Sequence, residues 1–429
     1  MNGAREAIRD ALDRVRTVDP HCHLRPDRPT ADTLADIVLY HHVWIELVSA
    51  GMDVREVTTA GLPHETADPG MPPLERVRRA LPYLAHVRTT TVGAMLRWIL
   101  EDLYGLDGPL SASNLDAAAR AVGDRARDAA WRDELLRERC GIAHSVTVEK
   151  GNAPPLDAIS RGKEWAPFNL ASGKLTPREV LDGWAKEFGR EITSAADYVE
   201  FIASSVAALP EDELKFVGFW LPPQLTERGA TEGEANRIIR AVRDGAVPSD
   251  DEIGRFAYCG VTTALSRMRS TKLRTIQLIT GAEVLPPHRS IAQWSGAFPG
   301  ALARIAGAFG DFEFNVSSAA DAFTQDIGVV AKHVPNVSVA GYWWHTLYPF
   351  YIRKSVETRI DMIPANKIVA FFSDAYHAEW CYPKLRLVKR IWEDVLVERV
   401  ESGFMDVDAA ADLVRAAFYE NPKRIYGIG

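Results

Sequence analysis

The sequence predicts a (β/α)8 barrel of the TIM type, because short apolar segments alternate with helical patterns along the chain. Eight segments rich in β-branched and aromatic residues read as strands. They cover residues 17–24, 144–150, 166–171, 215–221, 273–280, 311–317, 336–344 and 367–374. From the second segment onward, each gap can hold at least one helix, which indicates parallel βα units. An open doubly wound sheet is the alternative, but no glycine-rich phosphate loop follows the first strand.

One gap is much longer than a simple connection between a strand and the next element. Residues 25–143 separate the first two expected strands, whereas such connections usually take only a few residues. Within this gap, apolar side chains recur at helical spacing over residues 31–51, 72–87 and 91–105. We therefore expect a helical insertion, residues 25–143, within a single barrel domain that spans residues 1–429.

The composition favours a globular protein that acts on small molecules. The chain has 429 residues, of which 47% are hydrophobic and 25% charged, and its formal net charge is −8. Its basic clusters fall at the spacing of solvated helix faces, so we expect no nucleic-acid partner. The aromatic-rich segment 379–392 could bury a subunit interface, which leaves a homo-oligomer open.

The sequence also carries information about the compartment. Residues 1–16 form a charged amphipathic pattern without the apolar core of a signal peptide. No apolar run reaches membrane-spanning length, so we expect no membrane partner. The four cysteines are far apart and form no CxxC pair, which argues against a disulfide framework and a thiolate zinc site. We expect a cytoplasmic protein.

Two histidines mark the end of the first expected strand. His21 and His23 flank Cys22, and residues two apart on a strand point to the same face. Both imidazoles can therefore share one cation at the carboxyl end of the strand, where barrel enzymes keep their catalytic groups. The alternative is a pair of hydrogen-bonded surface histidines.

An aspartate ends the eighth expected strand. Asp374 follows the apolar run KIVAFFS, and the eighth strand of a closed barrel lies beside the first. The carboxylate can complete a metal site with His21 and His23, hold a water molecule or act as a base. The alternative is an N-cap for the following helix.

Further candidates lie on the insertion and near the seventh expected strand. Tyr40, His41 and His42 begin a helical pattern, in which adjacent side chains diverge by about 100°, so only one histidine is expected to face the metal. The seventh strand is expected to end in Trp343, Trp344 and His345. One tryptophan should line the pocket, and His345 could reach substrate or metal, or be a rim histidine without a role.

Residues that a binuclear site would need are missing. The fourth expected strand ends in Trp220 and offers no lysine that could be carbamylated, and the fifth and sixth offer Gln277 and Asn315 in place of histidines. Glu149 and Lys150 are the substitutes that the second strand could supply. One divalent metal ion is therefore favoured over two.

The order of these motifs resembles that of the glucuronate (uronate) isomerase family, a branch of the amidohydrolase superfamily, and suggests a divergent member. The resemblance runs thinly over nearly the whole chain. It rests on HCHL at 21–24, HHVW at 41–44, QL at 277–278, YWWH at 342–345 and SDAYHAEWCYPKLRLVKRIW at 373–392. The family's corresponding pieces are HCHL, an HYKW-like helix start, QLH, AWWF and TDSR followed by an aromatic-basic helix.

This resemblance implies a metal site and a reaction. His21, His23 and Asp374 would hold one divalent metal, with zinc the expected ion and manganese or iron as alternatives. The implied reaction is the aldose–ketose isomerisation of a sugar acid, by proton transfer between neighbouring carbons. The metal would polarise the carbonyl or its adjacent hydroxyl, while Asp374 and a group from the insertion move the proton.

The chain departs from the family where the family binds its substrate. Tyr376 stands in place of an arginine, Asn169 in place of the arginine of an FRPD-like motif, Ile279 in place of a histidine and His42 in place of a tyrosine. Losing both arginines removes the clamps that suit a carboxylate. The resemblance therefore carries the scaffold and the metal to this chain, but not the uronate substrate.

Candidate roles follow from the motifs and the resemblance. The expected catalytic residues are Asp374, His41, His42 and Tyr376. The expected substrate contacts are Tyr40, Asn169, Trp343, Trp344 and His345.

Three kinds of activity remain open at this point. The first is an isomerase acting on a sugar acid or related polyhydroxy compound. The second is a hydrolase or decarboxylase of the wider superfamily that uses a metal-activated water. The third is oxygen-dependent chemistry on iron, which the additional histidines would suit. A barrel without catalytic activity is the remaining alternative.

Overall fold

The computed structural model describes residues 2–57, 70–148, 158–170, 175–285 and 289–429. Its contacts divide the chain into two compact units. Unit 1 comprises Met1–Ile159 and Phe371–Arg415, and unit 2 comprises Ser160–Ala370 and Ala416–Gly429. That the whole chain forms one barrel domain remains a prediction.

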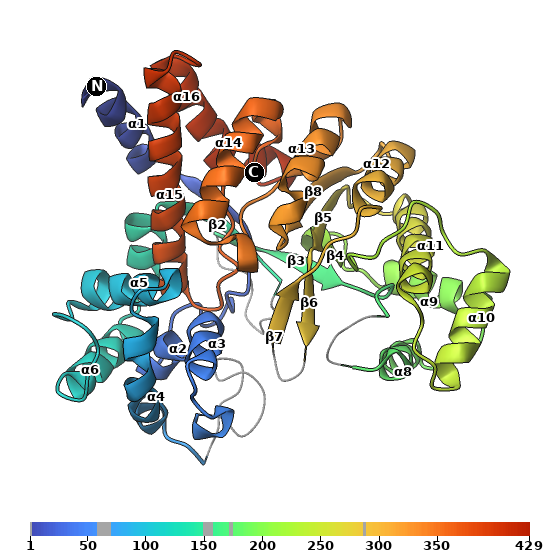
Figure 1. Ribbon diagram of the computed structural model, residues 1–429, viewed down its shortest axis with the longest axis horizontal. Coiled ribbons are helices and arrows are strands. Elements are labelled where there is room, and N and C mark those ends of the chain that lie inside the picture. The colour runs from blue at the N-terminus through green and yellow to red at the C-terminus, as the bar shows by residue number, and fades with distance from the viewer. Residues whose placement is uncertain (1, 58–69, 149–157, 171–174, 286–288) are drawn as a thin grey trace. The chain divides into compact units, whose positions relative to one another are not determined.

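Unit 1 holds two paired strands and a set of helices that lie between them in the sequence. β1 and β2 are parallel, with Val18 opposite His144 and Asp19 opposite Ser145. Helices α2 to α6 lie together in this unit (Figure 1), and they form the helical stretch that the apolar spacing predicted between the first two strands. The elements are α1 Asn2–Arg14, β1 Thr17–Cys22, α2 Leu34–Val38, α3 His41–Ser49, α4 Pro73–Val87, α5 Thr91–Trp98, α6 Leu115–Ala126, α7 Trp131–Asp133, β2 Ile142–Thr147, α15 Ala378–Glu401 and α16 Val407–Arg415.

Unit 2 contains parallel strands in the order β3-β4-β5-β8-β9, alternating with helices, and a separate antiparallel pair, β6 and β7. This alternation is what the predicted barrel class requires. The elements are β3 Ile159–Trp165, α8 Pro177–Phe188, α9 Ala195–Ala207, β4 Leu214–Trp220, α10 Glu232–Arg243, α11 Asp250–Met268, β5 Thr275–Thr280, β6 Ala282–Leu285, β7 Arg289–Ala292, α12 Phe298–Ala308, β8 Glu313–Ser318, α13 Thr324–His333, β9 Val337–Val339, α14 Pro349–Met362 and α17 Asn421–Ile425.

Several helices of unit 2 begin at a residue that caps their free backbone N–H groups. Thr176, Thr231 and Ser249 each accept a hydrogen bond from the backbone N–H three residues on, at the starts of α8, α10 and α11. A glutamate at that third position bonds back to the capping residue's own N–H. These capping boxes satisfy orphan donors at both ends of the first turn and so fix where each helix begins.

The core of unit 2 contains a buried chain of polar side chains on the inner strands. The Gln277 amide donates to the Tyr426 hydroxyl at 2.8 Å, and this hydroxyl donates to Asn315 Oδ1 at 2.7 Å. Asn315 Nδ2 in turn donates to Ser338 Oγ at 2.9 Å. Gln277 and Asn315, which stand where a second metal would need histidines, are thus engaged in the hydrogen bonding of the core.

A buried carboxylate joins the long helix α15 to the insertion helices of unit 1. Glu379 accepts hydrogen bonds from the backbone N–H of Ala31 at 2.9 Å, the Tyr104 hydroxyl at 2.9 Å and Trp131 Nε1 at 3.1 Å. The side chain is fully buried. Three donors on one carboxylate offset much of the cost of burying it.

The third expected strand was placed too late in the sequence. Residues 166–170 lie in a turn, in which the Asn169 N–H donates to Ala166 O at 3.2 Å, and the strand is β3, Ile159–Trp165. Its sequence, ISRGKEW, is too polar to read as an apolar run. Gly162 explains its place in the core: a Cβ there would lie 2.3 Å from the Phe216 ring, so only glycine lets this ring pack against β3.

The seventh expected strand is shorter than predicted, and the eighth is not a regular strand. β9 covers Val337–Val339 rather than 336–344, and residues 367–374 form no regular strand. In unit 2, Ile368 makes a single parallel bridge to Val339. In unit 1, the Ser373 N–H donates to the Asp19 side chain at 2.8 Å instead of to a backbone carbonyl. A side chain thus replaces the ladder partner, which keeps the segment extended but irregular.

Among the described residues, no helix is both long enough and apolar enough to span a membrane.

Candidate functional site

The two histidines at the end of β1 lie together, as their spacing predicted. His21 is 2% exposed, and His23 follows the strand and is partly buried. One ring nitrogen of each lies within 4.8 Å of the other. Both Nε2 atoms approach the same carboxylate oxygen, Asp374 Oδ1, at 3.5 Å from His21 and 3.3 Å from His23. Unit 1 therefore brings all three predicted metal ligands to one point.

The backbone on both sides of Asp374 holds this carboxylate in place. The Asp374 N–H donates to His21 O at 3.0 Å, and the His23 N–H donates to Ala375 O at 2.8 Å. Asp374 has a φ of 49°, in the left-handed region, which aspartate tolerates better than most residues. The side chain thus leaves the chain at an angle that a regular strand would not give.

The electrostatics of this cluster favour a charged carboxylate. Burial raises the pKa of Asp374, but hydrogen bonds with His21 and His23 outweigh it and hold the pKa well below its usual range. The nearby Lys384 ammonium acts in the same direction. Two imidazoles and an ionised carboxylate form a nitrogen-and-oxygen donor set that fits zinc, manganese or iron. The residues present therefore fit a divalent metal.

A buried lysine supports the segment that carries Asp374. Lys384 on α15 donates to Ser373 O at 2.7 Å, to Asp374 O at 3.3 Å and to the Tyr40 hydroxyl at 3.2 Å. Burial lowers the pKa of this ammonium. The Tyr40 hydroxyl itself donates to Asp374 O at 3.0 Å, and burial raises the Tyr40 pKa well above its usual range. Tyr40, an expected substrate contact, thus bonds to the backbone of the predicted ligand.

Tyr376, which stands where the sequence comparison expected an arginine, lies directly against one predicted metal ligand. The Tyr376 ring stacks on His23, with centroids 4.4 Å apart and planes 7° apart. The His41 ring meets Tyr376 edge-on at 5.5 Å. His41 and His42 begin α3 with ring centroids 4.1 Å apart. Of the two, His41 is buried and His42 is partly exposed. Ring contacts thus link His42, His41 and Tyr376 to His23, whose ring nitrogen approaches Asp374 Oδ1.

The expected substrate contacts after the seventh strand lie beyond its end rather than on it. β9 stops at Val339, and Trp344–Thr346 form a short 3-10 turn, with a Trp344 φ of 43°. The ring centroids of Trp343 and Trp344 lie 5.1 and 6.1 Å from that of Trp220 at the end of β4. Burial lowers the pKa of His345, which favours its neutral form. These aromatic rings form one cluster within unit 2.

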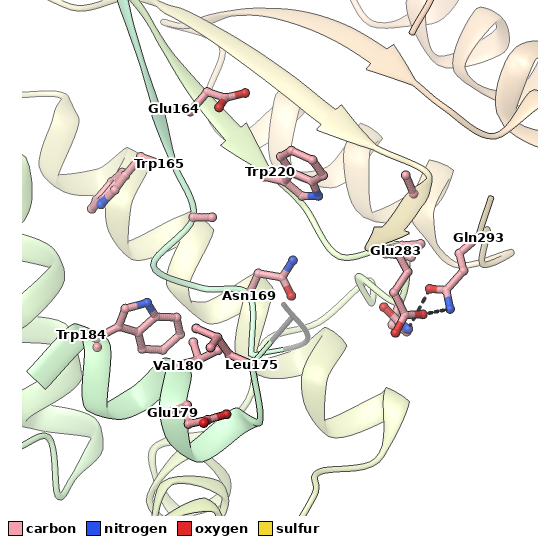
Figure 2. Close-up of a pocket in the computed structure, with 15 residues that line it drawn as sticks. Glu164, Trp165, Asn169, Leu175, Glu179, Val180, Trp184, Trp220, Glu283 and Gln293 are labelled. Carbon is pink, nitrogen blue, oxygen red and sulfur yellow. Dashed lines mark hydrogen bonds between the residues drawn. The ribbon is translucent and has the colours of Figure 1, made fainter. Parts of the chain in front are cut away.

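Unit 2 also contains a cavity of about 480 Å³, which Asn169 lines. Figure 2 shows Asn169 and Trp220 near its middle, Glu283 and Gln293 on one side, and Trp165 and Trp184 on the other. The lining is Glu164, Trp165, Ala166, Asn169, Leu175, Glu179, Val180, Gly183, Trp184, Trp220, Pro223, Gln224, Ala282, Glu283 and Gln293. Apart from Asn169, the sequence did not single these out as contacts. The misplaced third strand hid Glu164 and Trp165, and β6 was not predicted.

Two further candidates cannot be placed. Glu149 and Lys150, the proposed substitute ligands on the second strand, lie outside the described residues.

Comparison with known proteins identifies the fold. No family model and no curated protein sequence matches the chain. Among solved structures, it is similar to a glucuronate isomerase from Caulobacter crescentus, with a TM-score of 0.80 and 17% identity over 99% of this chain and 94% of the other. A uronate isomerase from Thermotoga maritima gives a TM-score of 0.78 and 15% identity over 99% and 97%.

A third structure widens the comparison. A protein assigned as a metal-dependent hydrolase from Lactobacillus casei gives a TM-score of 0.60 and 13% identity over 97% of this chain and 96% of the other. The predicted TIM-type fold class is thereby confirmed. The chain has the fold of these uronate isomerases at 17% and 15% sequence identity.

Proposed function

We propose that this chain is a metal-dependent enzyme that interconverts the aldose and ketose forms of a polyhydroxy compound. The observation that carries the proposal is the approach of His21 and His23 to the Asp374 carboxylate, at 3.5 and 3.3 Å. These three residues would hold one divalent ion, zinc first and manganese or iron as alternatives. The fold shared with uronate isomerases supports the reaction type.

The metal, when bound, would polarise the substrate's carbonyl or its neighbouring hydroxyl and so favour loss of a proton from the adjacent carbon. The reaction then needs a group that carries this proton between neighbouring carbons. Asp374 is a candidate base, because its carboxyl stays ionised. Tyr376, held by stacking on His23, and His42, the less buried histidine of α3, are the candidates for the second proton-transfer group, with His41 beside them.

Binding of the substrate is proposed for the residues singled out by the sequence, Tyr40, Asn169, Trp343, Trp344 and His345. Asn169 lines a cavity, and the two tryptophans belong to an aromatic cluster that includes another lining residue, Trp220. Aromatic faces and amide groups suit the apolar and hydroxyl surfaces of a sugar-like compound.

A hydrolase or decarboxylase is the second candidate. The structural similarity to a protein assigned as a metal-dependent hydrolase favours it, although that structure is less similar than the isomerases. The same three ligands could activate a water molecule for bond cleavage.

Metal analysis and isotope labelling test these alternatives together. Plasma mass spectrometry of protein purified without added metal should find about one zinc or manganese ion per chain. Turnover in deuterated water should place solvent deuterium on a product carbon, as proton transfer requires. If oxygen from labelled water appears in a cleaved product, the isomerase proposal is wrong and the hydrolase is supported. No metal, even after reconstitution, would refute both.

A further inference from the structure

The cavity in unit 2 contains a row of amides that bond to one another and to a carboxylate within its own lining. The Gln224 amide nitrogen donates to Gln293 Oε1 at 3.4 Å, and the Gln293 amide nitrogen donates to a Glu283 carboxylate oxygen. Figure 2 shows these contacts along one side of the cavity. The relay runs from amide to amide to carboxylate and ends on a group that can only accept.

This arrangement leaves acceptors available to a ligand. The Gln224 side-chain oxygen is buried and has no hydrogen-bond partner among the described residues. A buried carbonyl oxygen without a donor is costly, unless a bound molecule or water supplies one. A ligand that donates a hydrogen bond can satisfy this oxygen. Hydroxyl and ammonium groups donate, whereas an ionised carboxylate only accepts.

The charges of the lining favour the same kind of ligand. Glu164, Glu179 and Glu283 contribute three carboxyl groups, and none of the described lining residues is lysine, arginine or histidine. Glu179 stays charged, because hydrogen bonds with the backbone and side chain of Thr176 lower its pKa. Glu164 and Glu283 are partly buried, whereas Glu179 is exposed at the start of α8. The two partly buried carboxyl groups therefore disfavour an anionic ligand.

The other side of the cavity is aromatic. Trp165 and Trp184 lie opposite Glu283 and Gln293, with Trp220 between them (Figure 2). Trp165 is 7% exposed, and its indole N–H has no acceptor among the described residues. Flat apolar faces opposite polar groups match a compound with one C–H face and one hydroxyl edge. The buried Trp165 N–H can donate to a hydroxyl oxygen.

We propose that this cavity binds a hydroxyl-rich compound that is uncharged or carries an amine, and that it selects against a carboxylate-bearing analogue. The inference rests on the proposed function only in taking a polyhydroxy compound as the substrate. It names the substrate class, which is then a neutral or amine-bearing sugar or polyol rather than a sugar acid.

Three probes with the same carbon chain test the selection directly. D-glucamine, D-glucitol and D-gluconate differ only at carbon 1, which carries an ammonium, a hydroxyl or a carboxylate. Calorimetric titration of the full chain should give the lowest Kd for glucamine, an intermediate value for glucitol, and a value at least about tenfold higher for gluconate, equivalent to about 1.4 kcal/mol. Gluconate binding tightest, or no binding of any probe, overturns the proposal.

A charge-neutralising variant assigns the selection to this cavity. Glu283→Gln should narrow the ratio between the gluconate and glucamine Kd values by about fivefold, since removing one nearby charge is worth about 1 kcal/mol. Glu232→Gln, an exposed position on α10 outside the lining, should leave the ratio unchanged. An unaltered ratio in Glu283→Gln would refute the assignment.

These outcomes are separate from those of the proposed function. The titrations need no turnover and can be repeated on protein treated with a chelator. If the protein shows the expected selectivity but no proton exchange, the proposed isomerase activity is refuted and the proposed ligand class of the cavity stands. If it exchanges protons on a sugar acid and binds gluconate best, the isomerase activity stands and the proposed ligand class is refuted.

Discussion

The cluster of predicted metal ligands in unit 1 and the cavity in unit 2 use polar groups in opposite ways. Around Asp374, backbone amides, a tyrosine hydroxyl and a buried lysine hold the segment in place, so its geometry is set by the fold. In the cavity, amides and a carboxylate bond mainly to one another and leave an acceptor over. The first arrangement is preorganised for chemistry, and the second is incomplete without a ligand. The fold therefore determines the geometry of the ligand cluster, whereas the polar groups of the cavity also depend on which ligand is bound.

The largest effect should come from removing a ligand in unit 1. His23→Ala should lower kcat/KM by about a thousandfold, because a metal supplies several kcal/mol of transition-state stabilisation. Bound metal, measured by plasma mass spectrometry, should be lost while circular dichroism stays unchanged. His86→Ala on α4, at an exposed position, is the matched control and should retain both. Full activity in His23→Ala would remove the metal assignment.

A smaller effect is expected beside the ligands. Tyr376→Phe keeps the ring that stacks on His23 and removes only the hydroxyl. If that hydroxyl takes part in proton transfer, kcat should fall by about a hundredfold, at the low end for general acid–base catalysis, with little change in bound metal. Loss of metal instead of turnover would make Tyr376 a structural support of His23.

The cavity in unit 2 should respond in a different kinetic constant. Trp220→Ala removes a lining ring that also contacts Trp343 and Trp344. KM should rise by about tenfold with kcat nearly unchanged, since an aromatic contact contributes about 0.5–1.5 kcal/mol beyond its buried area. Phe350→Ala, at a residue 71% exposed, should change neither constant. A fall in kcat without a rise in KM would contradict a binding role for the cavity that differs from the catalytic role of unit 1.

The smallest effect concerns stability rather than activity. Burial raises the pKa of Glu379 above its ordinary value of 4.5, so the folded state holds this proton more tightly than the unfolded state. Its contribution to stability is present below pH 4.5 and is lost as pH rises through the folded-state pKa. The free energy of unfolding of the wild type should therefore fall over this interval relative to Glu379→Gln. Urea titrations across the interval test this, and a constant difference would contradict it.

Much of the fold could be predicted from the sequence, because most inner strands are apolar and β-branched. β1, β4, β5 and β8 were found within a few residues of their ends. β3 was missed because charged residues interrupt its apolar pattern. Its glycine, which allows close packing of the Phe216 ring, also gives no apolar signal. The eighth expected strand is not regular in the structure: the Ser373 N–H bonds to the Asp19 side chain, which lies more than 350 residues away in the sequence.

The candidate metal ligands could be predicted, and the cavity could not. The positions of His21, His23 and Asp374 make them recognisable in the sequence, since they lie at the ends of expected strands. The lining of the cavity has no such signal: Gln224, Glu283 and Gln293 are ordinary polar residues until the fold brings them together. The Tyr40 hydroxyl was expected at the substrate, and its bond to Asp374 O depends on a backbone position that no sequence pattern records.

The left-handed backbone at Asp374 has a consequence for how this protein can change over generations. The residue at position 374 must meet two independent requirements: it must adopt a left-handed backbone conformation, and it must carry a negative charge. Glycine and asparagine pass the first but bring no anion, and glutamate brings the anion but pays roughly 1–2 kcal/mol for the backbone. Only aspartate passes both, so no single substitution leads through a functional intermediate at this site. New specificities should therefore arise by drift in residues such as Gln224 and Glu283, while residue 374 stays fixed.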